Sequence, residues 1–291
     1  MNLSQIDYTS IIIETINSLF SSLLSSINNS LYSLLDELAF INTSIIDNSF
    51  FEKVFGNGFN VGILAISNSL LFGIIVYYSY TLFLAPFTSK QIEKPYQFIF
   101  KIIIFGICIN NSLFICKQII LINSLISDAI NEIGLKMFGI NVSFNSLISD
   151  ILVINKESSF TLISFDGLIK GFISFGLINL LLSYSLRYIL IKILVLLSPF
   201  AILTLINTST SWIFKTWLRT FLSMLFIQSF VSLILLIIFS IGKYSSSLLS
   251  QLLYLGGVYA LSKSNQYVRE LIGGISTDIN TNFNMLRIFS K

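Results

Sequence analysis

Residues 61–85, VGILAISNSLLFGIIVYYSYTLFLA, contain no charged side chain, and neither do residues 220–241, TFLSMLFIQSFVSLILLIIFSI. Each stretch is long enough to cross the hydrocarbon of a bilayer as a helix, because about 20 apolar residues suffice. Tyr77, Tyr78 and Tyr80 lie near the end of the first stretch and fit the aromatic belt of a membrane interface. These stretches predict an all-α, polytopic integral membrane protein.

The composition of the chain agrees with this prediction. Among 291 residues there are 17 Lys and Arg and 14 Asp and Glu, so 11% are charged and 54% are apolar. Soluble domains carry about 25% charge, and so few charges cannot cover a water-soluble globule.

Catalytic chemistry is not expected from these residues. The chain has no His, which excludes imidazole ligands and His-based catalytic pairs. The predicted spans carry no Asp or Glu at their centres, and the chain has no GxxxxGK phosphate-binding loop. We expect no enzyme, no cofactor and no metal site.

The first half of the chain predicts a transmembrane hairpin over residues 61–120. Its second span runs from about 98 to about 120, after a polar link at 88–96. Residues 121–166 carry several acids and lysines with helical apolar spacing, so they are expected to form an extracellular loop containing amphipathic helix.

The second half, residues 167–241, is expected to hold the third, fourth and fifth spans. Its apolar stretch 167–206 is either two spans that meet near Arg187 or one helix of about 60 Å, twice the hydrocarbon thickness. The distribution of Lys and Arg favours two spans, which gives about five transmembrane helices with residues 220–241.

The two ends of the chain differ in charge. Residues 1–52 hold six acids and no Lys or Arg, whereas the last 50 residues hold five bases and two acids. Basic segments stay in the cytoplasm. We therefore expect a multi-pass protein of the cell membrane, with residues 1–60 extracellular and the basic tail, residues 242–291, cytoplasmic.

An apolar stripe follows the N-terminal region from Ile16 to Ile41 in steps of three and four, which predicts an amphipathic helix. Its other face carries Ser and Asn and no Lys or Arg, unlike helices that lie on anionic lipid. We expect the stripe, with Leu31 and Leu34, to pack on a copy of the chain or on a partner. A helix lying on the bilayer is the alternative.

Arg187 and Lys192 are the charges closest to the middle of a predicted membrane segment. Cations at that depth tend to face a water-filled cavity or a protein partner. The simpler interpretation is that both mark a helix end and extend to the lipid headgroups.

The corner from Pro199 to Arg219 is a second candidate interface. Pro199 removes a helical hydrogen bond, and the freed carbonyl must find protein or water. Trp212, Lys215, Trp217 and Arg219 follow, and the spacing places Trp212, Lys215 and Arg219 on one helical face. This face is either an interfacial anchor or a contact with a neighbouring subunit.

Each predicted span also carries a small cluster of polar side chains. Their expected role is hydrogen bonding between helices, with a shared polar path as the alternative. The clusters are Ser67–Ser69, Asn110–Ser112, Asn179 with Ser183, and Gln228, Ser229 with Ser232.

Three segments carry a family resemblance. They are LLLSYSLRYILIKILVLLSPFAILTLI (180–206), STSWIFKTWLRTFLSMLFIQSFVSLILLIIFS (209–240) and YLGGVYALSKSNQYVRELIGGISTD (254–278). An Arg-Tyr pair before an apolar run ending in Ser-Pro-Phe-Ala, then Trp-x(4)-Trp-Leu and another span, resembles TrbL-type conjugal transfer proteins. These proteins are polytopic membrane subunits of type IV secretion systems, and the tail is similar to versions from mobile elements of Gram-positive bacteria.

The resemblance implies a non-enzymatic channel or scaffold component that helps a DNA–protein substrate cross the cell membrane. It implies a homo-oligomer in the lipid bilayer, assembled with other secretion subunits that include a secretion ATPase. A permease subunit or small-solute transporter is the alternative, which predicts a site of convergent polar groups within one protomer.

Overall fold

The computed structural model describes residues 29–47, 49–56, 61–88, 93–139, 141–147, 165–242 and 247–272, with the single positions 12 and 15. The elements of this part are all helices. They are α2 (Asn29–Ala39), η1 (Thr43–Ile45), α3 (Ser49–Phe55), α4 (Ile63–Thr88), α5 (Pro95–Asn110), α6 (Ser112–Phe138), α8 (Phe165–Leu203), α9 (Ser211–Gly242) and α10 (Ser247–Ile272).

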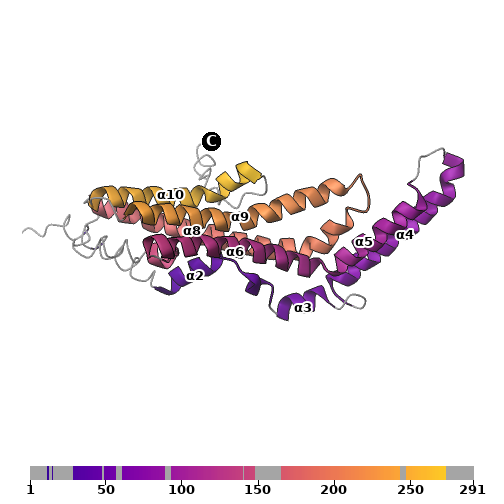
Figure 1. Ribbon diagram of the computed structural model, residues 1–291, viewed down its shortest axis with the longest axis horizontal. Coiled ribbons are helices and arrows are strands. Elements are labelled where there is room, and N and C mark those ends of the chain that lie inside the picture. Colours follow the sequence, from indigo (N-terminus) through magenta and orange to yellow (C-terminus); the bar gives the residue numbers. More distant parts are fainter. Residues whose placement is uncertain are drawn as a thin grey trace, which may run out of the picture.

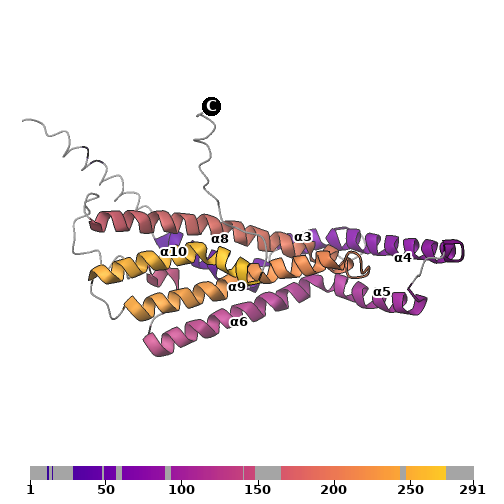
Figure 2. The same ribbon diagram turned by 90° about the horizontal axis from the view of Figure 1, so that it is seen from above.

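Four of these helices form a bundle. α6, α8, α9 and α10 run side by side along the long axis, and α2 packs against α8 (Figures 1 and 2). α8 and α10 run in one direction, while α6 and α9 run in the other. The bundle core is built from side chains such as Ile120, Tyr184, Phe221, Val231 and Leu261, which are buried.

Two glycines let α10 approach its neighbours closely. A Cβ atom on Gly176 of α8 would lie 2.5 Å from the Val258 side chain, and one on Gly257 would lie 2.4 Å from that of Ile238 on α9. Helices in lipid pack by such close contacts because hydrophobic attraction between them is weak.

α4 and α5 form an antiparallel hairpin that leaves the bundle at the end where α8 finishes (Figures 1 and 2). Near the hairpin turn, the rings of Tyr78 and Phe98 stack with their centroids 3.6 Å apart. At its base, both helices contact α8. None of the most apolar stretch of α4 is buried in the protein.

Four helices of the described part are long and apolar enough to cross a membrane: α4, α6, α8 and α9. α5 is apolar but has only 16 residues. The predicted class, an all-α membrane-embedded helical protein, is therefore confirmed.

The second predicted span differs from the structure. The helix is interrupted at Asn111, and α6 continues to Phe138, so residues 121–138 are not part of a loop. The Asn110 and Asn111 side chains donate to the carbonyls of Gly106 and Ile107, which competes with the regular backbone pattern.

The charges that suggested a loop lie on one side of α6. Asp128, Glu132 and Lys136 are exposed, whereas Ser124 and Ser127 are buried. α6 packs against α9. Acids and lysines on the outer face of a half-buried helix therefore do not end it.

The stretch 167–206 is one continuous helix, so the two-span alternative is wrong. α8 passes through Arg187 and Pro199 and ends at Leu203. Pro199 cannot donate to the carbonyl of Val195, and the Ser198 hydroxyl donates to that oxygen instead, at 2.7 Å. The freed carbonyl finds a protein partner, as predicted.

The region expected to be a separate tail is partly in the bundle. α10 packs along α8 and α9 with Tyr254, Val258, Leu261 and Val268 buried. Residues 148–164 of the predicted loop, residues 273–291 of the tail and most of the predicted N-terminal helix before Asn29 lie outside the described residues.

Candidate functional site: a buried arginine among four helices

Arg187 lies near the middle of α8, and its side chain turns into the bundle. It is fully buried, with 0% of its surface exposed. Its Nε donates to the carbonyl of Met224 on α9 at 2.7 Å, and its Nη1 donates to that of Ala39 at 3.1 Å. The guanidinium therefore ties three helices together, and it does not extend to the lipid headgroups.

The carbonyl of Ala39 is a favourable partner for a cation. Ala39 is the last residue of α2, and the last carbonyls of a helix have no partner within the helix. The end of the helix also carries about half a negative charge from the aligned peptide dipoles. α2 therefore compensates part of the Arg187 charge.

The remaining part of the charge has no partner within the described part of the chain. There, the Nη2 atom of Arg187 makes no hydrogen bond. Among the described residues, the ion pairs join other side chains: Lys101–Glu93, Lys117–Asp47 and Lys136–Glu132. A buried charge left uncompensated in this way is costly.

Three more buried polar atoms without partners accompany Nη2. They are the Tyr184 hydroxyl on α8 and the Ser264 hydroxyl and Asn265 Oδ1 on α10. The Tyr184 ring centroid lies 6.0 Å from Cζ of Arg187, and Ser264 lies beside the Tyr184 hydroxyl. We call these four residues the Arg187 cluster.

A second contact holds α2 over this cluster. The Asp36 carboxylate accepts backbone N–H groups of Phe144 and Asn145, at 2.7 and 3.2 Å. Burial raises the pKa of Asp36 above its usual value, and the two hydrogen bonds offset part of that rise. The Phe144 ring then packs against Tyr184, with centroids 6.0 Å apart.

Lys192 lies apart from the cluster. It is half-buried, and its Nζ lies 4.5 Å from the centroid of the Tyr188 ring, which is a cation–π contact. Arg187 and Lys192, grouped by the sequence, therefore have different environments.

The candidate residues of the corner after α8 also differ from one another in their environments. Pro199 and Trp217 are buried, and Trp217 donates from Nε1 to the carbonyl of Leu194 at 2.9 Å. Trp212, Lys215 and Arg219 are exposed, which confirms their shared face. Trp217 is thus a packing residue, and the candidate outer contact is limited to the other three.

The apolar stripe is displaced by one position on α2. Leu35 and Ala39 are buried, whereas Leu34 is 46% exposed, so the contact of Leu34 with a copy of the chain or a partner stays a prediction. The helix turns Leu35 and Ala39 towards α8 because Ala39 must reach Arg187. The side chain of Leu31 lies outside the described residues.

Part of the predicted polar clusters forms hydrogen bonds between helices, whereas Ser69 and Ser232 donate to carbonyls of their own helices. Asn123 of α6 donates to Gln228 of α9 at 3.2 Å and accepts from Ser229 at 3.3 Å, and all three are buried. In the hairpin, Asn68 of α4 donates to Asn110 of α5 at 3.1 Å.

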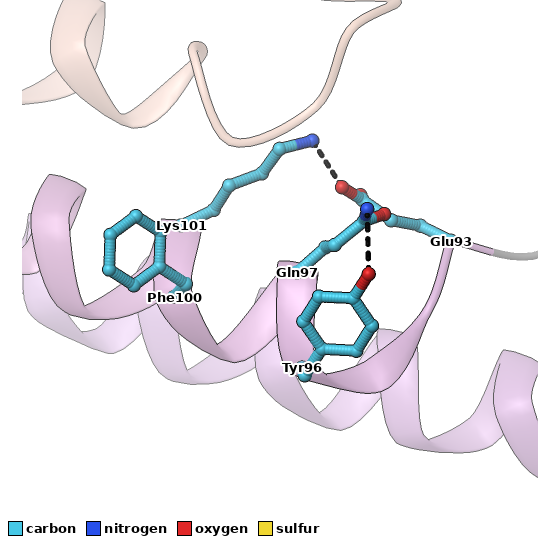
Figure 3. Close-up of a pocket in the computed structure, with 5 residues that line it drawn as sticks. All are labelled: Glu93, Tyr96, Gln97, Phe100 and Lys101. Atoms are coloured by element: carbon cyan, nitrogen blue, oxygen red, sulfur yellow. Dashed lines mark hydrogen bonds and ion pairs between the residues drawn. The ribbon is translucent and has the colours of Figure 1, made fainter.

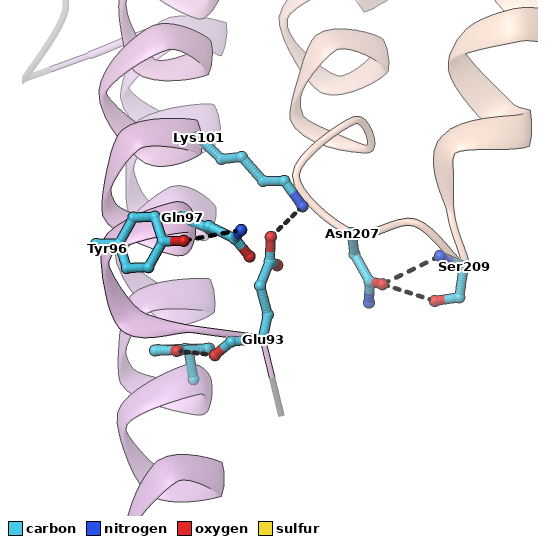
Figure 4. A network of polar contacts seen from close by, with 7 residues as sticks. Glu93, Tyr96, Gln97, Lys101, Asn207 and Ser209 are labelled. Atoms are coloured by element: carbon cyan, nitrogen blue, oxygen red, sulfur yellow. Dashed lines mark hydrogen bonds and ion pairs between the residues drawn. The ribbon is translucent and has the colours of Figure 1, made fainter. Parts of the chain in front are cut away.

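An open pocket of about 650 Å³ lies at the start of α5, lined by Glu93, Tyr96, Gln97, Phe100 and Lys101 (Figure 3). Its one ion pair joins Lys101 to Glu93 at 2.5 Å, and both side chains are partly exposed. Beside it, the α8–α9 turn holds a local contact in which Asn207 accepts from Ser209 (Figure 4). This pocket offers polar groups at a surface and no nucleophile–base pair.

No group of three or more Cys, Asp or Glu side chains that could hold a metal ion occurs within the described ranges. Comparison of the chain with protein-family models, with curated proteins and with solved structures finds no match in any of the three.

Sequence reasoning missed Asp36, Tyr184, Ser264 and Asn265. Tyr184 and Arg187 are three residues apart, which places both on one helical face. That spacing indicates that Tyr184 and Arg187 lie side by side, so Tyr184 could have been predicted from the sequence. Ser264 and Asn265 lie in a polar segment that resembles an ordinary tail, and only the packing of α10 brings them to Arg187.

Proposed function

We propose that this chain is a multi-pass membrane subunit of a conjugative type IV secretion apparatus, where it lines or braces the passage for a DNA–protein substrate. The observation that carries the proposal is the presence of two apolar surfaces at different positions along the long axis. One belongs to the α4–α5 hairpin, where Phe72 and Ile103 are exposed, and the other to the bundle, where Ile122 and Ile189 are exposed. The hairpin and the bundle follow one another along the long axis (Figures 1 and 2).

Helix lengths support this argument. The 44 residues from Pro95 to Phe138 extend about 66 Å along α5 and α6, and α8 extends about 58 Å. The hydrocarbon core of a bilayer is about 30 Å thick. One bilayer covers one of the two surfaces, so the other needs protein, which favours a subunit of an assembly over a protein that acts alone.

The resemblance to TrbL-type proteins adds a second argument. The three segments that carry it correspond to the later part of α8, to α9 and to α10, which pack together. Because these three helices pack together, the resemblance covers one structural unit, which favours an architecture shared with TrbL-type proteins.

The proposed orientation has the N-terminal region extracellular and the tail cytoplasmic. It follows from the charge of the two ends, because residues 1–52 hold six acids and no Lys or Arg, whereas residues 242–291 hold five bases and two acids. The turn between α8 and α9, which Lys215 and Arg219 follow, is placed on the cytoplasmic side for the same reason.

Single-cysteine labelling with an impermeant reagent tests the orientation, in a background with Cys108→Ser and Cys116→Ser. We expect labelling at Ser4→Cys and protection at Ser209→Cys and Ser276→Cys in intact cells. Labelling of Ser276→Cys or protection of Ser4→Cys would contradict the proposed sides of the two ends, and labelling of Ser209→Cys would contradict the cytoplasmic placement of the α8–α9 turn.

Gene deletion with complementation in donor cells tests the function. We expect loss of transfer to recipients, restored by the wild-type chain, and co-purification of the chain with the secretion ATPase. Transfer at the wild-type frequency without the chain would refute the proposal.

A pair of adjacent leucines tests the proposed homo-oligomer. Leu34 is exposed and Leu35 is 2% exposed. Leu34→Asp should reduce the mass of the detergent-solubilised complex and leave the chain folded, whereas Leu35→Asp should disrupt the packing of α2 on α8. An unchanged mass for Leu34→Asp would exclude this face of α2 as the interface.

A small-solute transporter is the second candidate, favoured by the Arg187 cluster. Convergent buried polar groups within one protomer are the feature that a substrate site needs. A transporter predicts solute flux in proteoliposomes of the purified chain and a monomer or dimer. Neither is expected of a secretion subunit.

A further inference from the structure

We propose that the donors of the Arg187 cluster, on Arg187, Tyr184 and Ser264, bind one small monovalent anion, such as chloride, inside the helical bundle. This inference concerns a ligand of the chain itself and does not rest on the proposed role in secretion.

The first argument is the number of unused donors. A guanidinium has five N–H groups, and the hydrogen bonds from Arg187 to Met224 and Ala39 use two of them. Nη2 carries two of the remaining N–H groups and has no partner. A charged donor that is removed from water and left unpaired needs an acceptor.

The second argument is the convergence of further hydroxyl groups. α8 and α10 run in the same direction, and Gly176 meets Val258 where the two helices touch. Eight residues further along α8 is Tyr184, and six residues further along α10 is Ser264. The register thus brings the two hydroxyls together within one turn of Arg187. Both hydroxyls are buried and lie beside each other, and neither has another partner among the described residues.

The third argument is the balance of charge. The described residues provide no carboxylate to Arg187, and the end of α2 supplies only a partial negative charge. One monovalent anion neutralises the formal charge of Arg187. A divalent anion would leave a net negative charge at membrane depth, where an unpaired charge is costly.

Because the cluster is enclosed by protein, its ligand must be small. Arg187, Tyr184 and Ser264 are each 0% exposed, and Asn265 is 3% exposed. α2 covers Arg187 through Ala39, and Phe144 packs on Tyr184. A lipid headgroup cannot reach such a site, so a ligand held there must be small.

Equilibrium dialysis of the purified full-length chain in detergent, with radioactive chloride in a gluconate buffer, tests the proposal. We expect saturable binding of one chloride per chain. Arg187→Gln should abolish the binding, and Tyr184→Phe and Ser264→Ala should each weaken it about tenfold, since each removes one donor. Lys192→Gln is the matched control, because it removes a cation of the same helix outside the cluster, and it should leave binding unchanged.

Tyr184→Phe and Ser264→Ala decide the result if Arg187→Gln fails to fold, because they remove only a hydroxyl. Saturable binding that both leave unchanged would overturn the proposal. So would the absence of saturable chloride binding, or a bromide-soaked crystal with only water at the cluster.

Discussion

α9 and α4 are both apolar helices of membrane-spanning length, and they differ in what surrounds them. In the most apolar stretch of α9, 61% of the residues are buried in the protein, and in that of α4 none are. α9 carries Gln228, Ser229 and Ser232 on its buried side. In α4, Ser69 and Ser79 are exposed and donate to carbonyls of their own helix.

The total apolarity of a helix therefore indicates that it lies in a membrane, but it does not show whether the helix packs on protein or on lipid. The position of polar side chains around the helix indicates this more directly. In α9, Gln228 and Ser229 contact Asn123 of α6. In α4, Ser69 and Ser79 donate to carbonyls of their own helix. The bundle is stabilised by contacts within the chain, and the outer surface of the hairpin is left to lipid or to another protein.

The largest expected effect compares two phenylalanines. Phe221 of α9 is 0% exposed and stacks on Trp217, whereas Phe72 of α4 is 67% exposed. Phe221→Ala should destabilise the bundle by about 3–5 kcal/mol through the cavity it leaves. Phe72→Ala should change stability by less than about 0.5 kcal/mol. The free energy of unfolding in mixed micelles measures both effects. Equal losses of stability would show that α9 and α4 do not differ in how much packing within the chain stabilises them.

A second pair compares the two amide contacts. Asn123→Leu leaves the buried Gln228 without its donor and should cost about 1–2 kcal/mol. Asn68→Leu removes the contact with the more exposed Asn110 and should cost about 0.5 kcal/mol. The same unfolding assay applies. A larger loss for Asn68→Leu would show that the hairpin depends on its own polar contact.

The two tryptophans give a smaller effect. Trp217→Phe removes the hydrogen bond to the carbonyl of Leu194 and should cost about 1 kcal/mol. Trp212→Phe combined with Arg219→Lys should leave the unfolding free energy unchanged, because both residues are exposed. DNA transfer is measured in parallel. Loss of transfer by the double variant at normal membrane levels would identify this face as a subunit contact, and full activity would leave it as an anchor.

The smallest expected effect concerns pH. Burial raises the pKa of Asp36, so the folded chain holds this proton more tightly than the unfolded chain. Its contribution to stability is full below its usual pKa of 3.8 and is lost as pH rises through the raised folded-state pKa. The thermal stability of the wild type relative to Asp36→Asn should therefore fall as the pH rises from 3.8 through the folded-state pKa of Asp36.

Glu37→Gln serves as the control for this titration, because Glu37 is the exposed neighbour of Asp36 on the same helix. It should leave the pH profile of stability unchanged. A profile that is the same for the wild type and Asp36→Asn would show that the contact with Phe144 and Asn145 is not sensitive to the charge of the carboxyl.

The sequence predicted the membrane class and the hydrogen bonds between helices, because both follow from local composition. It did not predict the length of α6, because Asp128, Glu132 and Lys136 were interpreted without knowing which face they occupy. It did not predict that Arg187 is enclosed, because α2 and α10 come from distant parts of the chain. Enclosure depends on packing between distant segments, which a pattern along one helix does not report.

The continuity of α8 has a mechanical consequence. Since the Ser198 hydroxyl takes the place of the bond that Pro199 cannot make, the helix is uninterrupted for 39 residues. One end of this rod meets the α4–α5 hairpin, and its middle is tied to α2 by Arg187. We therefore expect a force on the hairpin to be transmitted along α8 to α2, which contacts the buried Arg187. In mechanical terms, α8 couples the hairpin to the bundle.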